Sequence, residues 1–281
     1  MVSKLPDNFG NGFSNFFPLL IASPDQSETA VVRETSQMDF DMGGGGGDGQ
    51  PVPNLTYFAR DYLATIDAQP EDLFFHIVAI LHAPAYRTEN AGALRQDWPR
   101  VPLPKDADTL RAGTALGRQI AALLDPEIEV PGVTREPVRP ELAHLGELTA
   151  AAAAKPKTPD LALSARWGYA GQGSVVMPGS GEVRPGTRGD GFLDIHLNAT
   201  TRWRDVPAAV WSYTLGGYQV LKKWLSYREA ILLGRALTHE EALDFTNHVR
   251  RIAALIALHP RLDSHYEIAT GSAAGDDDER A

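Results

Sequence analysis

The sequence contains no cysteine among its 281 residues. Disulfide scaffolds, cysteine nucleophiles and zinc sites built from thiolates are therefore excluded, and the composition fits a reducing compartment. Long hydrophobic runs are also missing, since no segment approaches the roughly 18 apolar residues of a membrane-spanning helix. The first ten residues, "MVSKLPDNFG", lack the apolar core of a signal peptide. We expect a soluble cytoplasmic protein without membrane association.

An excess of positive charge is missing as well. The chain has 26 lysines and arginines against 36 aspartates and glutamates, which gives a formal net charge of -10. That balance opposes long-range attraction to polyanions and argues against a protein that binds DNA on its own. The charge is uneven, however, because six basic residues gather between residues 202 and 235, while "DDDE" lies in the C-terminal tail. The sequence is therefore compatible with a local basic surface.

Known catalytic motifs are also missing. There is no GxxxxGK[ST] phosphate loop, the spacing in "HEEALDFTNH" does not fit HExxH, and "PGSGE" does not fit GxSxG. The glycines of "FGNGF" follow no strand pattern, so we interpret them as an ordinary loop and not as a cofactor-binding turn. The sequence predicts no catalytic residue, no metal site and no cofactor site in this chain.

The hydrophobic periodicity predicts an α+β protein that begins with helices. Apolar residues recur at helical spacing in "LTYFARDYLATI", and Pro70 with two following acids suits the start of a second helix. A third helix is expected in "YRTENAGALRQDW". Asp108 is expected to cap a fourth helix, whose apolar stripe includes Leu116 and Ile120. These helices predict a helical lobe.

The second half of the chain predicts a mixed lobe with a small antiparallel sheet and long C-terminal helices. "FLDIHLN" alternates apolar and polar residues, which is typical of a half-buried strand. "ELTAAAAAK" is expected to form a short helix. Thr238 and Glu241 have the spacing of a capping box, and the helix that follows is expected to end before Pro260. The predicted organisation is a flexible segment with a Gly-rich linker (1–53), a helical lobe (54–125), a Pro/Ala-rich connection (126–159), a mixed lobe (160–268) and an acidic disordered tail (269–281).

The stretch "VWSYTLGGYQVLKKWLSYRE" (210–229) combines aromatic rings, two glycines and two lysines. Its apolar residues predict a helix with a buried face, on which Trp224 belongs to the core. The pair Gly216 and Gly217 is expected to begin that helix, because glycine permits unusual φ angles. Two interpretations of Lys222 and Lys223 stay open: they form a solvated helix face, or they contact phosphate near the helix N-terminus.

Three segments carry a resemblance to a known family. "FFHIVAILHAPAYRTENAGALRQDWPRVPLP" (74–104), "WGYAGQGSVVMPG" (167–179) and "VPAAVWSYTLGGYQVLKKWLSYRE" (206–229) resemble the C-terminal region of type ISP restriction-modification enzymes. Those enzymes combine a nuclease, a helicase-like ATPase, an adenine-N6 methyltransferase and a C-terminal target-recognition, or specificity, domain. The resemblance covers most of residues 54–268. The NPPY-type motif and the ATPase motifs of the family are not in this sequence.

The resemblance implies a module that reads DNA sequence without catalysing a reaction itself. Such a domain binds double-stranded DNA and presents the target base to a methyltransferase, here supplied by another part or chain. S-adenosylmethionine and ATP with magnesium are then expected only in the missing domains. The alternatives are a protein-interaction module or a nonfunctional truncated remnant. The candidate DNA-binding residues are Arg184, Arg188, Asn198, Arg202, Arg204, Tyr218, Gln219, Lys222, Lys223 and Arg228.

Overall fold

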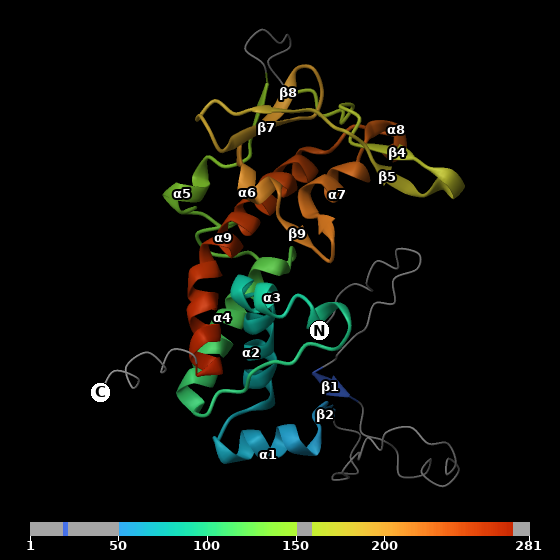
Figure 1. The fold of residues 1–281 in the computed structure, drawn as a ribbon. Helices are drawn as coiled ribbons and strands as arrows, with labels where there is room; N and C mark the ends of the chain where they lie inside the picture. The colour runs from blue at the N-terminus through green and yellow to red at the C-terminus, as the bar shows by residue number, and fades with distance from the viewer. Residues whose placement is uncertain (1–18, 22–50, 151–158, 272–281) are drawn as a thin grey trace. The chain divides into compact units, whose positions relative to one another are not determined.

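The computed structural model describes residues 19–21, 51–150 and 159–271 of the chain (Figure 1). Helices dominate the N-terminal part, and small antiparallel sheets followed by a long helix make up the C-terminal part. The α+β class predicted from the sequence is therefore confirmed. The pentaglycine linker, most of the acidic tail and residues 151–158 lie outside the described residues.

The chain divides into two compact units. The first consists of residues 1–117 and 262–281, and the second of residues 118–261. Two long helices contribute to both units, α4 (Ala107–Leu124) and α9 (His239–Thr270). The sequence-based division placed residues 262–268 in the mixed lobe, whereas the structure groups them with the first unit.

The helices of the first unit begin where the sequence supplies caps. The hydroxyl of Thr56 accepts a hydrogen bond from the amide of Ala59, and Gln69 and Asp72 form a capping box around Pro70. Leu63, Leu73 and Leu110 are buried together in the core of this unit. The helices before α4 are α1 (Tyr57–Thr65), α2 (Pro70–His82), α3 (Pro84–Glu89) and the 3-10 turn η1 (Ala93–Arg95).

The cap of α4 lies two residues before the predicted one. The carboxylate of Asp106, and not that of Asp108, accepts hydrogen bonds from the amide and the hydroxyl of Thr109, at 2.8 and 2.9 Å. Asp108 instead pairs with Arg111 on the exposed surface. The cap must precede the first helical residue, Ala107, and only Asp106 meets that condition.

A short β-pair precedes the helices. Strand β1 (Leu20–Ile21) runs antiparallel to β2 (Val52–Pro53). These four residues fall in the segment predicted as flexible (1–53), and here they form a paired ladder; residues 1–18 and 22–50 of that segment lie outside the described residues. A strand of two residues carries too little apolar sequence to be recognised from its pattern.

The second unit is built on a four-stranded antiparallel sheet with the order β3, β8, β7, β6. The edge strand β3 covers the first four residues of the segment 147–155 that the sequence predicted as a short helix, and the rest of that segment lies outside the described residues. Its residues pair with Thr201–Arg204 of β8, so contacts with a distant strand determine the structure of Glu147–Ala150. The strands of this sheet are β3 (Glu147–Ala150), β6 (Val183–Pro185), β7 (Phe192–His196) and β8 (Thr201–Pro207).

Strand β7 is buried more completely than its alternating pattern predicts. Ile195 and Leu197 are inaccessible, but Asp194 and His196, expected on a solvated face, are also buried. Asp194 pairs with Arg202 of β8, and the backbone of His196 accepts a hydrogen bond from the indole of Trp167. The side chain of Asp194 is therefore a structural group with a partner, as buried charged groups generally are.

Short elements surround this sheet and the start of α9. Helix α7 lies beside the hairpin of β4 and β5 (Figure 1). The remaining elements of the unit are α5 (Pro140–Ala143), β4 (Gly168–Ala170), η2 (Gln172–Ser174), β5 (Val176–Pro178), α6 (Ala208–Trp211), β9 (Thr214–Leu215), β10 (Tyr218–Gln219), α7 (Val220–Ser226) and α8 (Ala230–Leu233).

The long helix α9 begins as predicted and ends later than predicted. The side chains and amides of Thr238 and Glu241 form the expected capping box, with bonds of 2.8 and 3.1 Å. Arg235 also donates hydrogen bonds to the Glu241 carboxylate. These bonds, together with the one from the Thr238 amide, lower the pKa of Glu241 to about 2. Pro260 does not end the helix, because buried residues beyond it, such as Leu262, hold the last turns in the core.

Candidate nucleic-acid interface

The two glycines of the 210–229 stretch form a hairpin turn. Gly216 and Gly217 have φ angles of +57° and +81° and connect β9 to β10. Only glycine adopts two successive left-handed conformations without strain, which explains the pair. The prediction that they begin the helix is wrong, since α7 begins at Val220. The turn instead brings Leu215 and Tyr218 to the surface, where 46% and 54% of their area is exposed.

Lys223 is held between two aromatic rings at the base of this hairpin. Its ammonium lies 4.7 Å from the centre of the Tyr218 ring and 4.9 Å from that of the Tyr227 ring. Each ring face attracts a cation, so the two tyrosines restrict the position of the charge. The neighbouring Lys222 is half-buried in the same helix. Tyr227 was not among the predicted site residues, although its spacing of four residues from Lys223 is a detectable signal.

The other predicted residues of this stretch point into the protein. Arg228 lies over the ring of Trp224 at 4.0 Å and donates a hydrogen bond to the Trp224 carbonyl. Burial lowers the pKa of its guanidinium. Gln219 donates from its side-chain amide to the carbonyl of Trp211. Both residues therefore stabilise the local fold around α7.

Helix α7 ends earlier than the sequence suggests, and this places Glu229 in the interior. Glu229 and Ser226, predicted mostly toward solvent, are buried, while Ile231, predicted on the apolar face, is 86% exposed. The two carboxylate oxygens of Glu229 accept hydrogen bonds from the amides of Arg166 and Trp167, at 3.0 and 2.7 Å. Glu229 thus fixes the start of the β4–β5 hairpin against the end of α7.

Three of the four predicted arginines of the sheet and its loops form ion pairs. Arg202 pairs with the buried Asp194 at 2.8 Å, and Arg204 binds Glu147 on β3. Arg184 pairs with Glu182. These acids lie on neighbouring strands or turns and neutralise much of the positive charge that the sequence places here. Within the part of the chain that the structure describes, the guanidinium of Arg188 forms no such pair and lies 5.1 Å from the centre of the Phe192 ring.

Asn198 organises the turn between β7 and β8. Its amide nitrogen donates to the carbonyls of Asp160 and Ala162, at 2.9 and 2.8 Å. Its amide oxygen accepts from the backbone of Thr200 and Thr201. The side chain is buried and its hydrogen-bonding capacity is largely used, so Asn198 supports the loop and does not present a group for a ligand.

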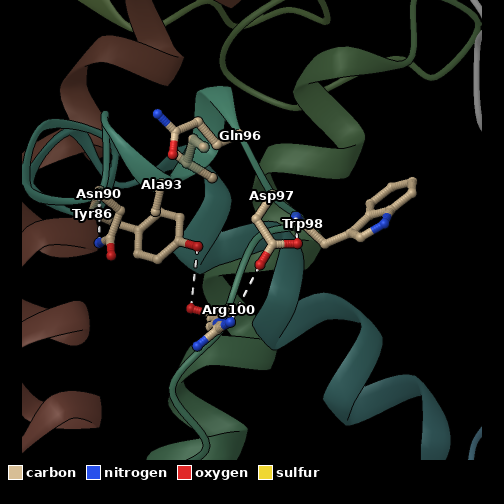
Figure 2. Close-up of a pocket in the computed structure, with 8 residues that line it drawn as sticks. Tyr86, Asn90, Ala93, Gln96, Asp97, Trp98 and Arg100 are labelled. Carbon is tan, nitrogen blue, oxygen red and sulfur yellow. Dashed lines mark hydrogen bonds and ion pairs between the residues drawn. The ribbon is translucent and has the colours of Figure 1, made fainter.

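A pocket lies in the first unit, apart from the predicted residues. Its volume is about 320 Å³, and Figure 2 shows the hydroxyl of Tyr86 directed toward Arg100, with Asp97 on the other side of Arg100. The hydroxyl of Tyr86 donates to the carbonyl of Arg100, and Asp97 pairs with the Arg100 guanidinium at 3.2 Å. The indole of Trp98 points away from the pocket in this view and is 62% exposed.

The described residues contain neither a metal-binding cluster nor a membrane span. No three histidine, aspartate or glutamate side chains among them gather as metal ligands would. None of their helices is long and apolar enough to cross a bilayer.

Comparison with known proteins assigns the family. The family model described as the Type ISP C-terminal specificity domain matches residues 2–255. Among solved structures, the chain is similar to a DrdV–DNA complex (22% identity, 77% of this chain, 20% of that chain, TM-score 0.47). It is also similar to a nuclease-deletion mutant of the Type ISP restriction-modification enzyme LlaGI bound to a DNA substrate mimic (17% identity, 78% of this chain, 17% of that chain, TM-score 0.42). The chain spans about a fifth of the length of both proteins. No curated protein sequence shows significant similarity to it.

Proposed function

The chain belongs to the Type ISP C-terminal specificity domain family, and from this membership we propose that it is a DNA target-recognition module of a restriction-modification enzyme. One observation carries the proposal: the family match extends over residues 2–255 of 281. The module binds double-stranded DNA and presents it to an adenine-N6 methyltransferase supplied by another part or chain.

The surface of the second unit supports contact with DNA at two places. The β9–β10 hairpin presents Tyr218 beside the ammonium of Lys223, and the loop after β6 presents Arg188. A lysine is a point charge suited to phosphate, whereas an arginine has the planar fork that matches a base edge. Lys223 is therefore the candidate for contact with the DNA backbone, and Arg188 is the candidate for reading base edges.

A partner is part of this proposal. The formal net charge of -10 slows capture of DNA at long range, so the methyltransferase or helicase partner speeds the encounter, whereas the local contacts of this chain hold a duplex at low salt. S-adenosylmethionine and ATP with magnesium would bind to that partner. This chain would supply sequence recognition and the placement of the target base.

Selection from a random duplex pool tests the proposal. The purified chain, incubated with the pool at low salt, should retain duplexes that share a short sequence. Retention of DNA without enrichment of any sequence would show unspecific binding and contradict a recognition function. Failure to retain DNA at low salt would also contradict it, and would favour the alternative of a protein-interaction module.

The combined replacement of Lys222 and Lys223 by alanine should weaken binding to selected and unrelated duplexes by a similar factor. Phosphate contacts carry no sequence information, and each one lost reduces the slope of log affinity against log salt by about 0.9. The slope should therefore fall by up to about 2 in magnitude. Fluorescence anisotropy over a salt series measures both quantities.

A variant that removes two charges elsewhere is the matched control. Lys105 and Arg135 are exposed and lie outside the candidate interface, so their double replacement by alanine should leave the salt slope nearly unchanged. A change in the preferred sequence with an unchanged slope in the Lys222 and Lys223 variant would assign these lysines to base recognition instead.

A further inference from the structure

Asp205 has a backbone conformation that is unusual for a residue in a strand. It lies in β8 with a φ angle of +55°, opposite the point where the register between β7 and β8 shifts. A non-glycine residue in the left-handed region is strained, although aspartate tolerates it better than most. Bulges of this kind redirect a side chain out of the regular alternation of a strand. The bulge therefore turns the carboxylate of Asp205 away from the direction that a regular strand would give it.

The carboxylate of Asp205 holds the loop between β6 and β7. Its Oδ1 atom accepts hydrogen bonds from the backbone amide of Arg188 at 3.2 Å and from the hydroxyl of Thr187 at 3.3 Å. The side chain of Asp205 is almost completely buried. Its own amide donates to the carboxylate of Asp194 at 3.1 Å, which fixes the bulge from the other side. The loop backbone is thus anchored at the residue that carries the exposed guanidinium.

Arg188 differs from the other predicted arginines in what its side chain does. Arg184, Arg202 and Arg204 bind acids within the protein. Arg188 is exposed, its amide is fixed by Asp205, and its guanidinium is placed near the Phe192 ring. An arginine whose backbone amide is fixed by a carboxylate and whose guanidinium lies over an aromatic ring loses little freedom when it binds a planar partner.

We propose that Arg188 determines sequence specificity by donating two hydrogen bonds to the O6 and N7 atoms of a guanine, and that Asp205 is the residue that positions it. The inference rests on the proposed function. Bidentate contact between arginine and guanine is the commonest specific contact in the major groove, and it requires a fixed fork. The buried carboxylate and the strained bulge supply that fixation.

The test compares binding to the selected duplex with binding to duplexes changed at one base pair. Arg188→Ala should reduce the preference for one G·C pair by roughly 10- to 100-fold while other positions keep theirs. Replacing that guanine by 7-deazaguanine, which lacks N7, should weaken binding of the unmodified chain and leave Arg188→Ala unaffected. Arg188→Lys keeps the charge but not the fork, so it should lose the preference and keep the salt slope.

The role of Asp205 is tested with two variants. Asp205→Ala removes the acceptor and should reduce the preference for the same G·C pair. Asparagine keeps an acceptor and tolerates the backbone conformation, so Asp205→Asn should retain most of that preference. Thr187→Val removes one of the two bonds without altering the strand and provides a second measurement if Asp205→Ala does not fold. Arg135→Ala removes an exposed arginine outside the candidate interface, so it is the matched control and should leave every base preference unchanged.

The outcomes separate this inference from the proposed function. If the unmodified chain selects no sequence, the proposed function fails. If it selects a sequence and Arg188→Ala keeps every base preference, only the role of Arg188 is overturned. If Arg188→Ala instead lowers the affinity for all duplexes equally and reduces the salt slope by about 1, Arg188 contacts phosphate, and its proposed role in base recognition is overturned as well. Retention of the G·C preference by both Asp205→Ala and Thr187→Val would overturn the positioning role.

Discussion

Replacement of Trp203 by alanine should lower the free energy of unfolding of the second unit by about 3 to 5 kcal/mol, the usual cost of removing a large aromatic side chain from a core. Trp203 is inaccessible to solvent, its ring lies 4.1 Å from that of Phe245 between centroids, and its indole donates to the carbonyl of Ala242. Chemical denaturation followed by circular dichroism measures the loss.

Trp224 provides the comparison for this prediction. It belongs to the same aromatic cluster, 6.5 Å from Trp203 and 5.5 Å from Phe245, but it is only half-buried. Trp224→Ala should therefore cost less than Trp203→Ala, although the sequence predicted that Trp224 belongs to the core. A greater loss from Trp224→Ala would show that the cluster depends on its outer ring and on the Arg228 side chain stacked upon it.

The position of Trp203 links this stability to the candidate interface. Its neighbours in β8, Arg202 and Arg204, pair with Asp194 and Glu147 on the two adjacent strands. A cavity beneath β8 should loosen these pairs together with the strained Asp205. We therefore expect Trp203→Ala to reduce DNA discrimination at temperatures well below its unfolding transition.

The sequence predicted the parts of the fold that local rules determine. Helical periodicity and caps located α1, α2 and the start of α9, because their side chains meet within one or two turns. It failed where a distant partner decides the structure. Glu147–Ala150 forms a strand because β8 offers it a ladder, and α9 passes Pro260 because residues beyond it are buried. Such contacts join residues far apart in the chain and leave no local periodicity.

In the candidate site, too, the sequence predicted local properties but not contacts with distant residues. Charge and residue type indicated which side chains could meet DNA, but not which of them the fold already uses. Asn198 and Arg202 looked available in the sequence, whereas the structure binds them to Asp160 and Asp194. Asp205 carries no sequence signal for its role, since its importance comes from a bulge and from hydrogen bonds to a loop 17 residues earlier.

The first unit contains a buried pair of histidines whose protonation should control its stability. Nδ1 of His76 lies 3.1 Å from Nε2 of His265, and Nε2 of His76 lies 2.9 Å from the carbonyl of Pro102. The carbonyl can only accept, so Nε2 of His76 carries a proton and its Nδ1 accepts from His265. Gly113 packs directly against both rings, where a Cβ atom would lie 2.4 Å from His265. Both imidazoles are therefore neutral and enclosed.

Acidification from pH 7.5 to 5.0 should destabilise the first unit by about 2 kcal/mol through His265 alone. Burial, and then the proximity of His76, lowers the pKa of His265 from 6.5 to about 4, and burial lowers the pKa of His76 as well. Below pH 6.5 the unfolded chain binds protons that the folded pair resists. The contribution is thus complete above pH 6.5 and is lost as the pH falls toward 4. Thermal unfolding over this pH range measures the loss.

His265→Gln isolates this contribution from that of the other histidines. Glutamine keeps a donor for His76 but does not titrate, so the variant should lose about 2 kcal/mol less than the unmodified chain between pH 7.5 and 5.0. His239→Gln, at an exposed position at the start of α9, is the control and should show the acid sensitivity of the unmodified chain. Equal acid sensitivity in the His265 variant and the unmodified chain would mean that the folded pair accepts a proton without cost. The enclosure of both rings against Gly113 argues against that outcome, because the hydrogen bonds described for the pair join the two rings to each other and to a carbonyl, and none of them involves a carboxylate that would stabilise a cation.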